Sequence, residues 1–390
     1  MSVTAAKGFE AGGSVCGIKA GGAPDLAIVT TASRQPVAAA GVFTLNLASA
    51  APVQVSRRHL GDGVASAVVL SSGNANAATG EQGRADALRM AELTAAGLGC
   101  ATGDVLVCST GLIGYPMPMA ALESGIPALA ADLNGAGAAA EAILTTDTVR
   151  KEAVAPVGDT AAVVGGMAKG AAMLMPAMAT MLAVLTTDAA VDPVTLQLAL
   201  ARAVDDTFNQ LCVDACTSTN DTVLALAGGA SGVSIDDRAG AHALTDALTE
   251  TCGSLAEQMA RDAEGATKLA RVTVCGARSD AEAHMAARTV ARSQLVQCSL
   301  NGEDPYWGRI LSELGVSGAV FDPEAVEIAY NGIVSCRNGI AAPHDAEALR
   351  KAMAGREVVI ACDLGNGSGR AAVIFTDLSC AYIDENRGTS

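Results

Sequence analysis

Short apolar runs rich in β-branched residues recur along the whole chain, and longer amphipathic segments separate many of them. Most of the runs are flanked by Gly, Asn or Asp, as strands usually are. The runs that predict strands are 25–31, 67–71, 104–109, 142–146, 182–187, 222–227, 271–275, 326–330, 358–363 and 371–376. Because they lack a regular βαβ period, they predict an α/β protein of the α+β type, with mixed sheets that pack on one another under a cover of helices.

Five longer segments have apolar residues at helical spacing, which predicts that they form the helices that cover the sheets. They are 82–97, 193–209, 237–263, 280–293 and 345–355. The second segment has the clearest start, with Asp192 as N-cap and Pro193 at the first helical position. Leu196, Leu200 and Val204 then follow at intervals of four residues and form one apolar stripe that can be buried.

Composition restricts what such a fold can bind. Half of the 390 residues are hydrophobic, only 3% are aromatic, and the formal net charge is −16. This hydrophobic content excludes disorder, and the negative charge disfavours a nucleic-acid backbone. The scarcity of rings also disfavours stacking on single-stranded nucleic acid. We therefore expect no nucleic-acid partner.

Localisation is predicted from three features. The eleven cysteines form no CxxC pair and lie mostly in apolar runs, which favours reduced thiols in a cytoplasmic enzyme. The N-terminal residues combine no positive cluster with an apolar core, so no signal peptide is expected. The uncharged stretch 170–187 approaches the length of a membrane span, but Pro176 lies in its middle, so we expect a buried strand–turn–strand and no membrane partner.

Common cofactor and metal signatures are missing from the sequence. The segment Gly365-Asn-Gly-Ser-Gly-Arg370 resembles a phosphate loop, but it lies between two predicted strands, which favours a hairpin turn. The four histidines are scattered without a second ligand at metal-binding spacing. We expect no metal and no bound cofactor.

Small polar side chains gather instead in five segments of otherwise apolar sequence, namely 72–80, 108–114, 169–182, 217–221 and 262–268. Each segment alone has a structural explanation, since Asn and Gly favour turns, Thr favours strands and Asp caps helices. Together they predict a site built from hydroxyls, amides and single charges.

The ordered motifs of the chain point to one family. The most specific run is Gly166-Met-Ala-Lys-Gly170 followed by Pro176-Ala-Met-Ala-Thr-Met-Leu182. Further motifs in the same order are Gly73-Asn-Ala-Asn-Ala77, Ser109-Thr-Gly-Leu-Ile-Gly114, Leu144-Thr-Thr-Asp-Thr148, Ser218-Thr-Asn-Asp-Thr222, Asp304-Pro-Tyr-Trp-Gly-Arg309 and Ala381-Tyr-Ile-Asp-Glu-Asn386. Over nearly its whole length the chain resembles the ornithine acetyltransferase (glutamate N-acetyltransferase) family of arginine biosynthesis.

This resemblance implies a self-cleaving acetyltransferase fold of the N-terminal-nucleophile kind. The cut falls between Ala179 and Thr180, which gives an α chain of 1–179 with the oxyanion hole and an N-terminal α/β domain. The β chain, 180–390, begins with the nucleophile and contains a C-terminal α/β domain. A freed N-terminal Thr suits the task, because its own α-amine, with a pKa near about 8, can act as the base for its hydroxyl.

The resemblance also implies roles for individual residues. Thr180 is the nucleophile, and Thr110 (hydroxyl) and Gly111 (backbone N–H) form the oxyanion hole. The implied substrate-binding residues are Thr145, Lys169, Thr180, Glu264, Asn386 and Ser390. Thr146 is the alternative to Thr145. A lone lysine suits the substrate α-carboxylate, whereas Glu264 suits the δ-ammonium of ornithine or orients the backbone.

The implied function is transfer of acetyl from N2-acetyl-L-ornithine to L-glutamate by a ping-pong mechanism through acetyl-Thr180. The residues leave open whether acetyl-CoA is a second donor. The family pairs two α and two β chains, so an α2β2 heterotetramer is expected. An N-terminal-threonine amidohydrolase and an uncleaved, non-catalytic relative remain as alternatives.

This sequence also departs from the family pattern. Ala172 and Ala215 replace glycines, Ala177 replaces a polar residue, and Tyr306 replaces an Asn. The segment after Asn386 is one residue shorter than usual. Replacing Gly by Ala matters where φ is positive or space is tight.

Overall fold

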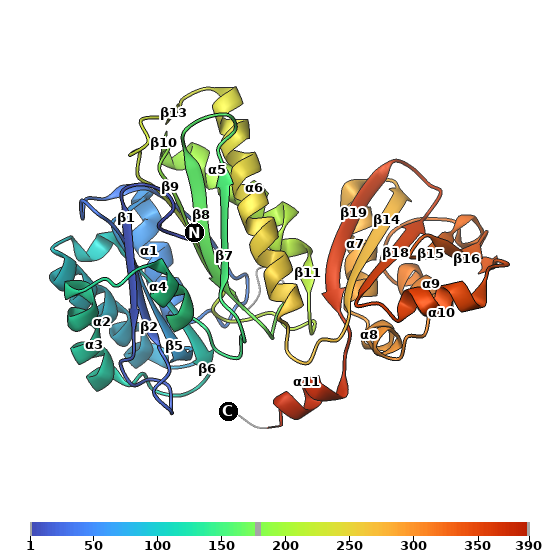
Figure 1. The fold of residues 1–390 in the computed structure, drawn as a ribbon, viewed down its shortest axis with the longest axis horizontal. Helices are drawn as coiled ribbons and strands as arrows, with labels where there is room; N and C mark the ends of the chain where they lie inside the picture. Colours follow the sequence, from blue (N-terminus) through green and yellow to red (C-terminus); the bar gives the residue numbers. More distant parts are fainter. Residues whose placement is uncertain (1, 176–180, 388–390) are drawn as a thin grey trace. The chain divides into compact units, whose positions relative to one another are not determined.

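The computed structural model describes residues 2–175 and 181–387. It divides into two compact units (Figure 1). The first contains Met1–Asn209 and Thr217–Met259, and the second contains Gln210–Cys216 and Ala260–Ser390. The predicted chains 1–179 and 180–390 meet at a bond outside the described residues. The units do not divide there, because strands from both sides of that bond belong to the first unit.

A four-stranded sheet forms one half of the first unit, in the order β1 (Phe9–Ser14), β2 (Leu26–Thr31), β5 (Ala67–Asn74) and β6 (Val105–Leu112). Strands β5 and β6 run parallel, and the other pairs are antiparallel. One face of this sheet is covered by α1 (Ala51–His59), α2 (Gly80–Leu98) and α3 (Met119–Ala131), which share a core with residues such as Leu26, Ile28 and Val107.

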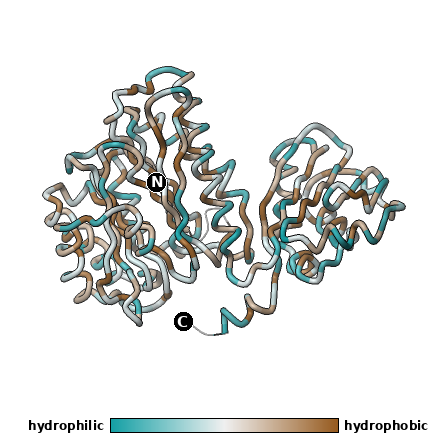
Figure 2. The backbone as a smooth tube through the Cα atoms, in the orientation of Figure 1, coloured by the Kyte–Doolittle hydropathy of each residue, from teal (hydrophilic) through white to brown (hydrophobic). Residues whose placement is uncertain are grey.

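A six-stranded sheet forms the other half, in the order β4 (Val64–Ala65), β3 (Val37–Phe43), β12 (Thr222–Ala227), β9 (Leu182–Thr187), β8 (Val163–Lys169) and β7 (Lys151–Pro156). Figure 2 shows hydrophobic stretches along its central strands. Helix α5 (Pro193–Asp206) packs on β3 and β12, and Thr251 and Leu255 of α6 (Arg238–Arg261) lie close to Gly166 of β8. The small sheet of β10 (Ala190–Val191) and β13 (Ser234–Ile235) completes the unit.

The two large sheets of the first unit share one core. Residues of both sheets, among them Val29, Leu106, Val184 and Leu224, belong to it together with α4 (Ala136–Ala142). The order from helices to sheet to sheet to helices confirms the predicted α/β architecture of packed mixed sheets under a helical cover. Strands β8 and β9 lie side by side and antiparallel, with Lys169 paired to Leu182.

The second unit has one seven-stranded mixed sheet. Its order is β11 (Leu211–Cys212), β19 (Gly369–Thr376), β14 (Leu269–Ala277), β18 (Glu357–Asp363), β15 (Glu327–Tyr330), β16 (Ile333–Arg337) and β17 (Ile340–Ala341). Helix α7 (Asp280–Ala291) packs on β14 and β19. Helices α8 (Gln294–Asn301) and α9 (Trp307–Gly315) pack on α7, and α10 (Ala346–Met353) packs on β15 and β18. Helix α11 (Cys380–Glu385) follows the last strand.

Three local predictions were wrong or only partly right. Segment 142–146 is no strand, because the alanine-rich α4 extends to Ala142 and a turn follows. Segment 365–370 is no hairpin turn, because β18 and β19 lie on opposite sides of β14 and do not pair with each other. In the described parts of the stretch 170–187, which are 170–175 and 181–187, the one strand is β9, since β8 already ends at Lys169. Within the described residues, we find no helix long and apolar enough to cross a membrane.

Candidate active site

Strand β6 ends at the predicted oxyanion hole. Thr110 is 3% exposed, and Gly111 follows it opposite Gly73 of β5, where the register of the two strands shifts. Gly111 has a φ of +131°, and a Cβ added to it would lie 2.3 Å from the carbonyl carbon of Gly73. Only glycine fits this position, because both the dihedral angle and the space exclude a side chain. Glycine is therefore required at 111 because the backbone of Gly73 lies so close to it.

Lys169, at the end of β8, brings two of the predicted hydroxyls together. Its Nζ donates to Thr145 Oγ1 at 2.6 Å and lies 3.5 Å from Thr110 Oγ1. The lysine side chain is 3% exposed, so these contacts are shielded from water. Thr145 is the residue that contacts Lys169, whereas Thr146 is exposed.

Asp147 is the anion that organises this cluster, and its side chain is fully buried. Its Oδ1 accepts hydrogen bonds from Lys151 Nζ at 2.6 Å and from the Gly170 N–H at 2.7 Å. Its Oδ2 accepts from the Thr145 N–H at 3.1 Å and lies 3.7 Å from Lys169 Nζ. One carboxylate thus fixes the loop before β7 relative to the end of β8.

The electrostatics of Asp147 follow from these contacts. Burial by itself would raise the pKa of the Asp147 carboxyl, but the ammonium groups of Lys169 and Lys151 and the Gly170 N–H outweigh burial. They hold the pKa far below its usual range, so the group stays ionised at neutral pH. Sequence reasoning missed Asp147 and Lys151 as site residues, although Asp147 directly follows the Thr-Thr pair of a quoted motif.

Two further predicted residues meet in the second unit. Asn386 Nδ2 donates to Glu264 Oε2 at 2.8 Å, and Glu264 is 8% exposed. Helix α11 holds this pair together, since Ser379 Oγ donates to the Gly265 carbonyl at 2.5 Å. The Tyr382 hydroxyl donates to Asp214 Oδ2 at 3.2 Å.

Gly265 allows α11 to pack directly against the backbone at this position. It has a φ of +61°, and a Cβ there would lie 2.2 Å from the Tyr382 nitrogen. Any other residue would force the helix away and displace Asn386, which follows α11 directly.

The structure therefore gathers Thr110, Gly111, Thr145 and Lys169 in the first unit, and Glu264 and Asn386 in the second. The other predicted site residues, Ala179, Thr180 and Ser390, lie outside the described part of the chain. In the described ranges 2–175 and 181–387, no group of three or more His, Cys, Asp or Glu side chains could hold a metal ion.

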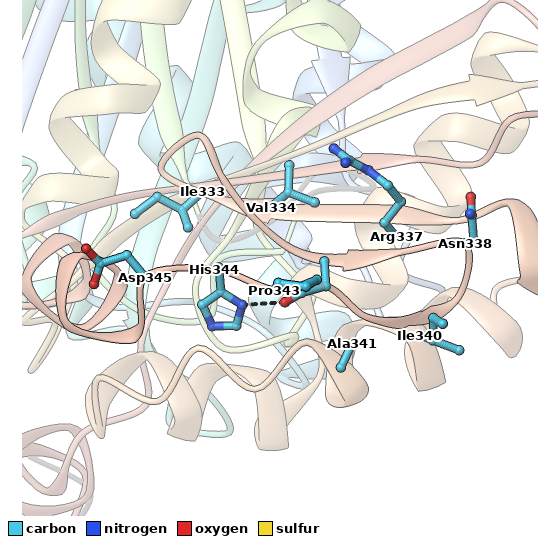
Figure 3. A pocket seen from close by; sticks show the side chains of 10 residues that line it. Ile333, Val334, Arg337, Asn338, Ile340, Ala341, Pro343, His344 and Asp345 are labelled. Atoms are coloured by element: carbon cyan, nitrogen blue, oxygen red, sulfur yellow. Dashed lines mark hydrogen bonds between the residues drawn. The ribbon is translucent and has the colours of Figure 1, made fainter.

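Figure 3 shows a pocket in the second unit that contains none of these residues. It is lined by β16, β17 and the loop that leads to α10, including Arg337 and Asn338. His344 Nδ1 lies 2.8 Å from the Ala342 carbonyl oxygen, so the ring is engaged with its own loop. We assign this pocket no part in the site.

The departures from the family pattern differ in their structural consequence. Ala215 has a φ of +61°, in the region that favours glycine, whereas Ala172 has no positive φ. Tyr306 is 55% exposed, and the Arg309 guanidinium lies 5.8 Å from the centre of its ring. Ala177 lies outside the described residues. Of the described departures, Ala215 is therefore the strained one.

Residues 10–388 of the chain match the model of the ArgJ family, whose members are acetyltransferases of arginine biosynthesis, so the chain is an enzyme of the acyltransferase class. It is 47% identical to the arginine biosynthesis bifunctional protein ArgJ of Streptomyces coelicolor, over 100% of both chains. It is 45% identical to the protein of the same description from Thermobifida fusca, again over 100% of both.

A solved structure with similarity to this chain is the ornithine acetyltransferase of Mycobacterium tuberculosis complexed with ornithine. The two are 41% identical, with a TM-score of 0.41, over 45% of this chain and 94% of the other. The family match and the full-length relatives establish that this chain belongs to the ArgJ family of arginine biosynthesis.

Proposed function

We propose that this protein cleaves itself between Ala179 and Thr180 and then transfers acetyl from N2-acetyl-L-ornithine to L-glutamate through acetyl-Thr180. The observation that carries the proposal is the buried cluster of Lys169, Thr145 and Thr110 on Asp147, directly beside the backbone of Gly111. Such a cluster supplies a cation and hydroxyl groups without a bulky side chain, as a small acetylated amino acid requires.

In the first step the Thr180 hydroxyl attacks the acetyl carbonyl carbon, and the α-amine of Thr180 takes the hydroxyl proton. The amide C–N bond of acetylornithine breaks, and ornithine leaves with a proton on its α-amine. In the second step the α-amine of glutamate attacks the acetyl ester. The ester C–O bond breaks, N-acetylglutamate forms, and the Thr180 hydroxyl regains its proton.

Each step passes through a tetrahedral oxyanion. We assign its stabilisation to the Thr110 hydroxyl and the Gly111 N–H, which come from adjacent residues near the end of β6. Loss of one such donor typically raises the barrier by about 3–4 kcal/mol. The low exposure of Thr110 strengthens this interaction, because water screens it less.

The remaining residues bind the amino-acid parts of the substrates. Lys169 and Thr145 bind the α-carboxylate, and the Asp147 contact fixes the direction of the lysine. Glu264, oriented by Asn386, binds the δ-ammonium of ornithine. Ser390 contacts the substrate at the C-terminal end of the chain.

Three finer points belong to the same proposal. The cleaved α and β chains assemble as an α2β2 heterotetramer in the cytoplasm. Acetyl-CoA is a further acetyl donor to test. No metal or bound cofactor takes part, because the Thr180 amine and hydroxyl supply both base and nucleophile.

Denaturing mass spectrometry and an acceptor assay test this function. We expect two fragments that end at Ala179 and begin at Thr180, and formation of N-acetylglutamate from acetylornithine and glutamate. The Thr180→Ala variant should remain uncut and inactive. A single intact 38.8 kDa species in an active preparation would contradict the mechanism. Release of acetate with no N-acetylglutamate would instead identify an amidohydrolase.

A further inference from the structure

The loop 217–221, here called the clamp loop, contacts both described flanks of the predicted cleavage segment. Thr217 Oγ1 donates to the Met175 carbonyl at 3.2 Å, on the upstream side. On the downstream side, the Met181 N–H donates to Asp221 Oδ1 at 2.9 Å. Both contacts lie within the first unit.

Met181 is held from two directions. While its N–H is bound by the Asp221 side chain, its carbonyl accepts from the Thr222 N–H at 3.1 Å. This follows from the sheet, since β9 and β12 run parallel with Leu182 paired to Thr222. Asp221 therefore directly precedes β12, and Met181 directly precedes the adjacent strand β9.

The clamp loop also contacts the strand of the oxyanion hole. Asn220, 4% exposed, donates through Nδ2 to the Ser109 carbonyl at 2.8 Å and to the Ala75 carbonyl at 2.6 Å. Ser109 directly precedes Thr110. Two consecutive side chains of one loop thus connect the start of β9 to the end of β6.

The Asp221 carboxyl can accept more hydrogen bonds than these contacts provide. It is fully buried, and its Oδ2 has no hydrogen-bond partner among the described residues. A buried carboxyl with one oxygen unbonded is unfavourable for folding alone. Such groups persist at functional sites, where position matters more than stability.

We infer that Asp221 is a positioning residue of the transfer reaction, which holds the peptide after Thr180 in register with Thr110 and Gly111. This rests on the proposed role of Thr180. Nucleophile and oxyanion donors must be aligned closely, because a shift of about 1 Å costs on the order of 100-fold in rate. Removal of the Asp221 acceptor should therefore lower kcat and leave the KM for acetylornithine nearly unchanged.

The test compares Asp221→Ala with Asp221→Asn and with Asp188→Ala. Asp188 is a matched control, because it is also buried at an end of β9 and its carboxylate also accepts backbone N–H groups, from Lys7 and Val163. It lies at the opposite end of the strand. Self-cleavage, kcat, KM and the unfolding temperature are measured for each purified full-length variant.

We expect Asp221→Ala to cut more slowly than wild type and, once cut, to have a kcat about 100-fold below wild type. Asp221→Asn should retain most activity, because its amide oxygen can still accept from Met181. Asp188→Ala should keep its kcat within about threefold, even with an equal loss of thermal stability. Equal kcat losses in the Asp221→Ala and Asp188→Ala variants would overturn the inference. So would an Asp221→Asn enzyme as impaired as Asp221→Ala.

Two further measurements distinguish failure of the Asp221 role from failure of the proposed function. If Asp221→Ala does not fold, Asp221→Ser takes its place, since serine is too short to reach Met181, and the same loss of kcat is expected. Wild-type protein incubated with acetylornithine must carry an acetyl group on the chain that starts at Thr180. Its absence would refute the proposed function, whereas its presence with an unaffected Asp221→Ser enzyme would refute only the positioning role.

Discussion

Two buried carboxyl groups of the first unit, Asp147 and Asp221, have opposite electrostatic surroundings. Two lysine ammonium groups surround Asp147 and lower its pKa, whereas burial raises the pKa of Asp221 well above its usual value. Met181, Thr44 and Lys169 act against this rise at Asp221 but do not outweigh it. The two residues should therefore change stability with pH in opposite directions.

The Asp147→Asn variant should be much less stable than wild type at pH 7. Removing one partner of a buried ion pair costs about 3–5 kcal/mol, because the lysine charges remain. The depressed pKa of Asp147 contributes stability above its unfolded value of about 3.9. The deficit should thus shrink as pH falls below about 4, as urea unfolding at several pH values would show.

Catalysis should be affected by the same substitution. We expect the KM for acetylornithine to rise about tenfold, equivalent to about 1.4 kcal/mol, since Lys169 loses its anchor. Asp206→Asn is the control, because Asp206 forms an exposed ion pair with Arg202 and its loss should cost under about 1 kcal/mol. Equal effects of the two substitutions would contradict the assignment of Asp147.

Asp221→Asn should show the reverse pH dependence. A raised pKa in the folded state favours the protonated form, so its stabilising contribution is complete below the unfolded pKa of about 3.9. It is lost as pH rises towards the folded pKa, by at most about 1.4 kcal/mol per pH unit. The stability of the variant relative to wild type should therefore increase between about pH 4 and 7. A pH-independent difference in urea unfolding would show that Asp221 is ionised in the folded protein.

Ala215→Gly should stabilise the protein. The φ of +61° at Ala215 costs about 1–2 kcal/mol for a residue with a Cβ. Glycine removes this cost, but it loses more backbone entropy on folding, which offsets part of the gain in stability. We expect a net gain of about 0.5–1 kcal/mol in the free energy of unfolding. Ala172→Gly, where φ is not positive, should give no gain. A destabilised Ala215→Gly variant would contradict the strain argument.

At the scale of elements, α11 is the part whose position most depends on a single residue. Gly265→Ala would place a methyl group against the Tyr382 backbone at a positive φ. We expect a loss of about 2 kcal/mol and a rise in the KM for acetylornithine, because Asn386 is displaced from Glu264. Gly315→Ala is the control, since Gly315 has no neighbour within 4 Å of an added Cβ. Unchanged kinetics in Gly265→Ala would show that α11 does not support the site.

The sequence predicts the elements that contain strong local signals. All five predicted helices form, and nine of the ten predicted strands overlap an observed strand. The strands that were missed include the longer β1, β3, β7 and β8, in which Ala and Gly interrupt or replace the β-branched residues. Strand β3 pairs with β12, which is far along the chain, whereas β1 pairs with β2 and β7 pairs with β8. In each case the pairing stabilises residues whose own β-propensity is low, which a local pattern does not show.

The candidate site was predictable to a similar degree. Motifs single out Thr110, Lys169 and Asn386 because each stands in an ordered family pattern. Asp147, Lys151 and the link from Asn220 to Ser109 were missed, because they depend on contacts between separate strands and loops. The requirement for glycine at 111 was missed as well, since it arises from the close approach of Gly73 on the neighbouring strand.

At the scale of the whole molecule, small residues connect the fold to its chemistry. Only 3% of the residues are aromatic, and Ala, Gly, Ser and Thr allow strand ends and loops to meet closely around Lys169. Because β8 and β9 pair from Val164 and Thr187 to Lys169 and Leu182, a cut between Ala179 and Thr180 would leave both new chains in the same sheet. Self-cleavage would therefore free the Thr180 amine without separating the chains.

The most direct test of this account is the intact mass of the wild-type protein after brief incubation with N2-acetyl-L-ornithine and no acceptor. Our account predicts two chains that meet at Ala179 and Thr180, with one acetyl group on Thr180 of the chain that begins there. Glutamate should then remove that acetyl group as N-acetylglutamate. Acetylornithine-dependent formation of N-acetylglutamate by a chain that is neither cut nor acetylated would contradict it.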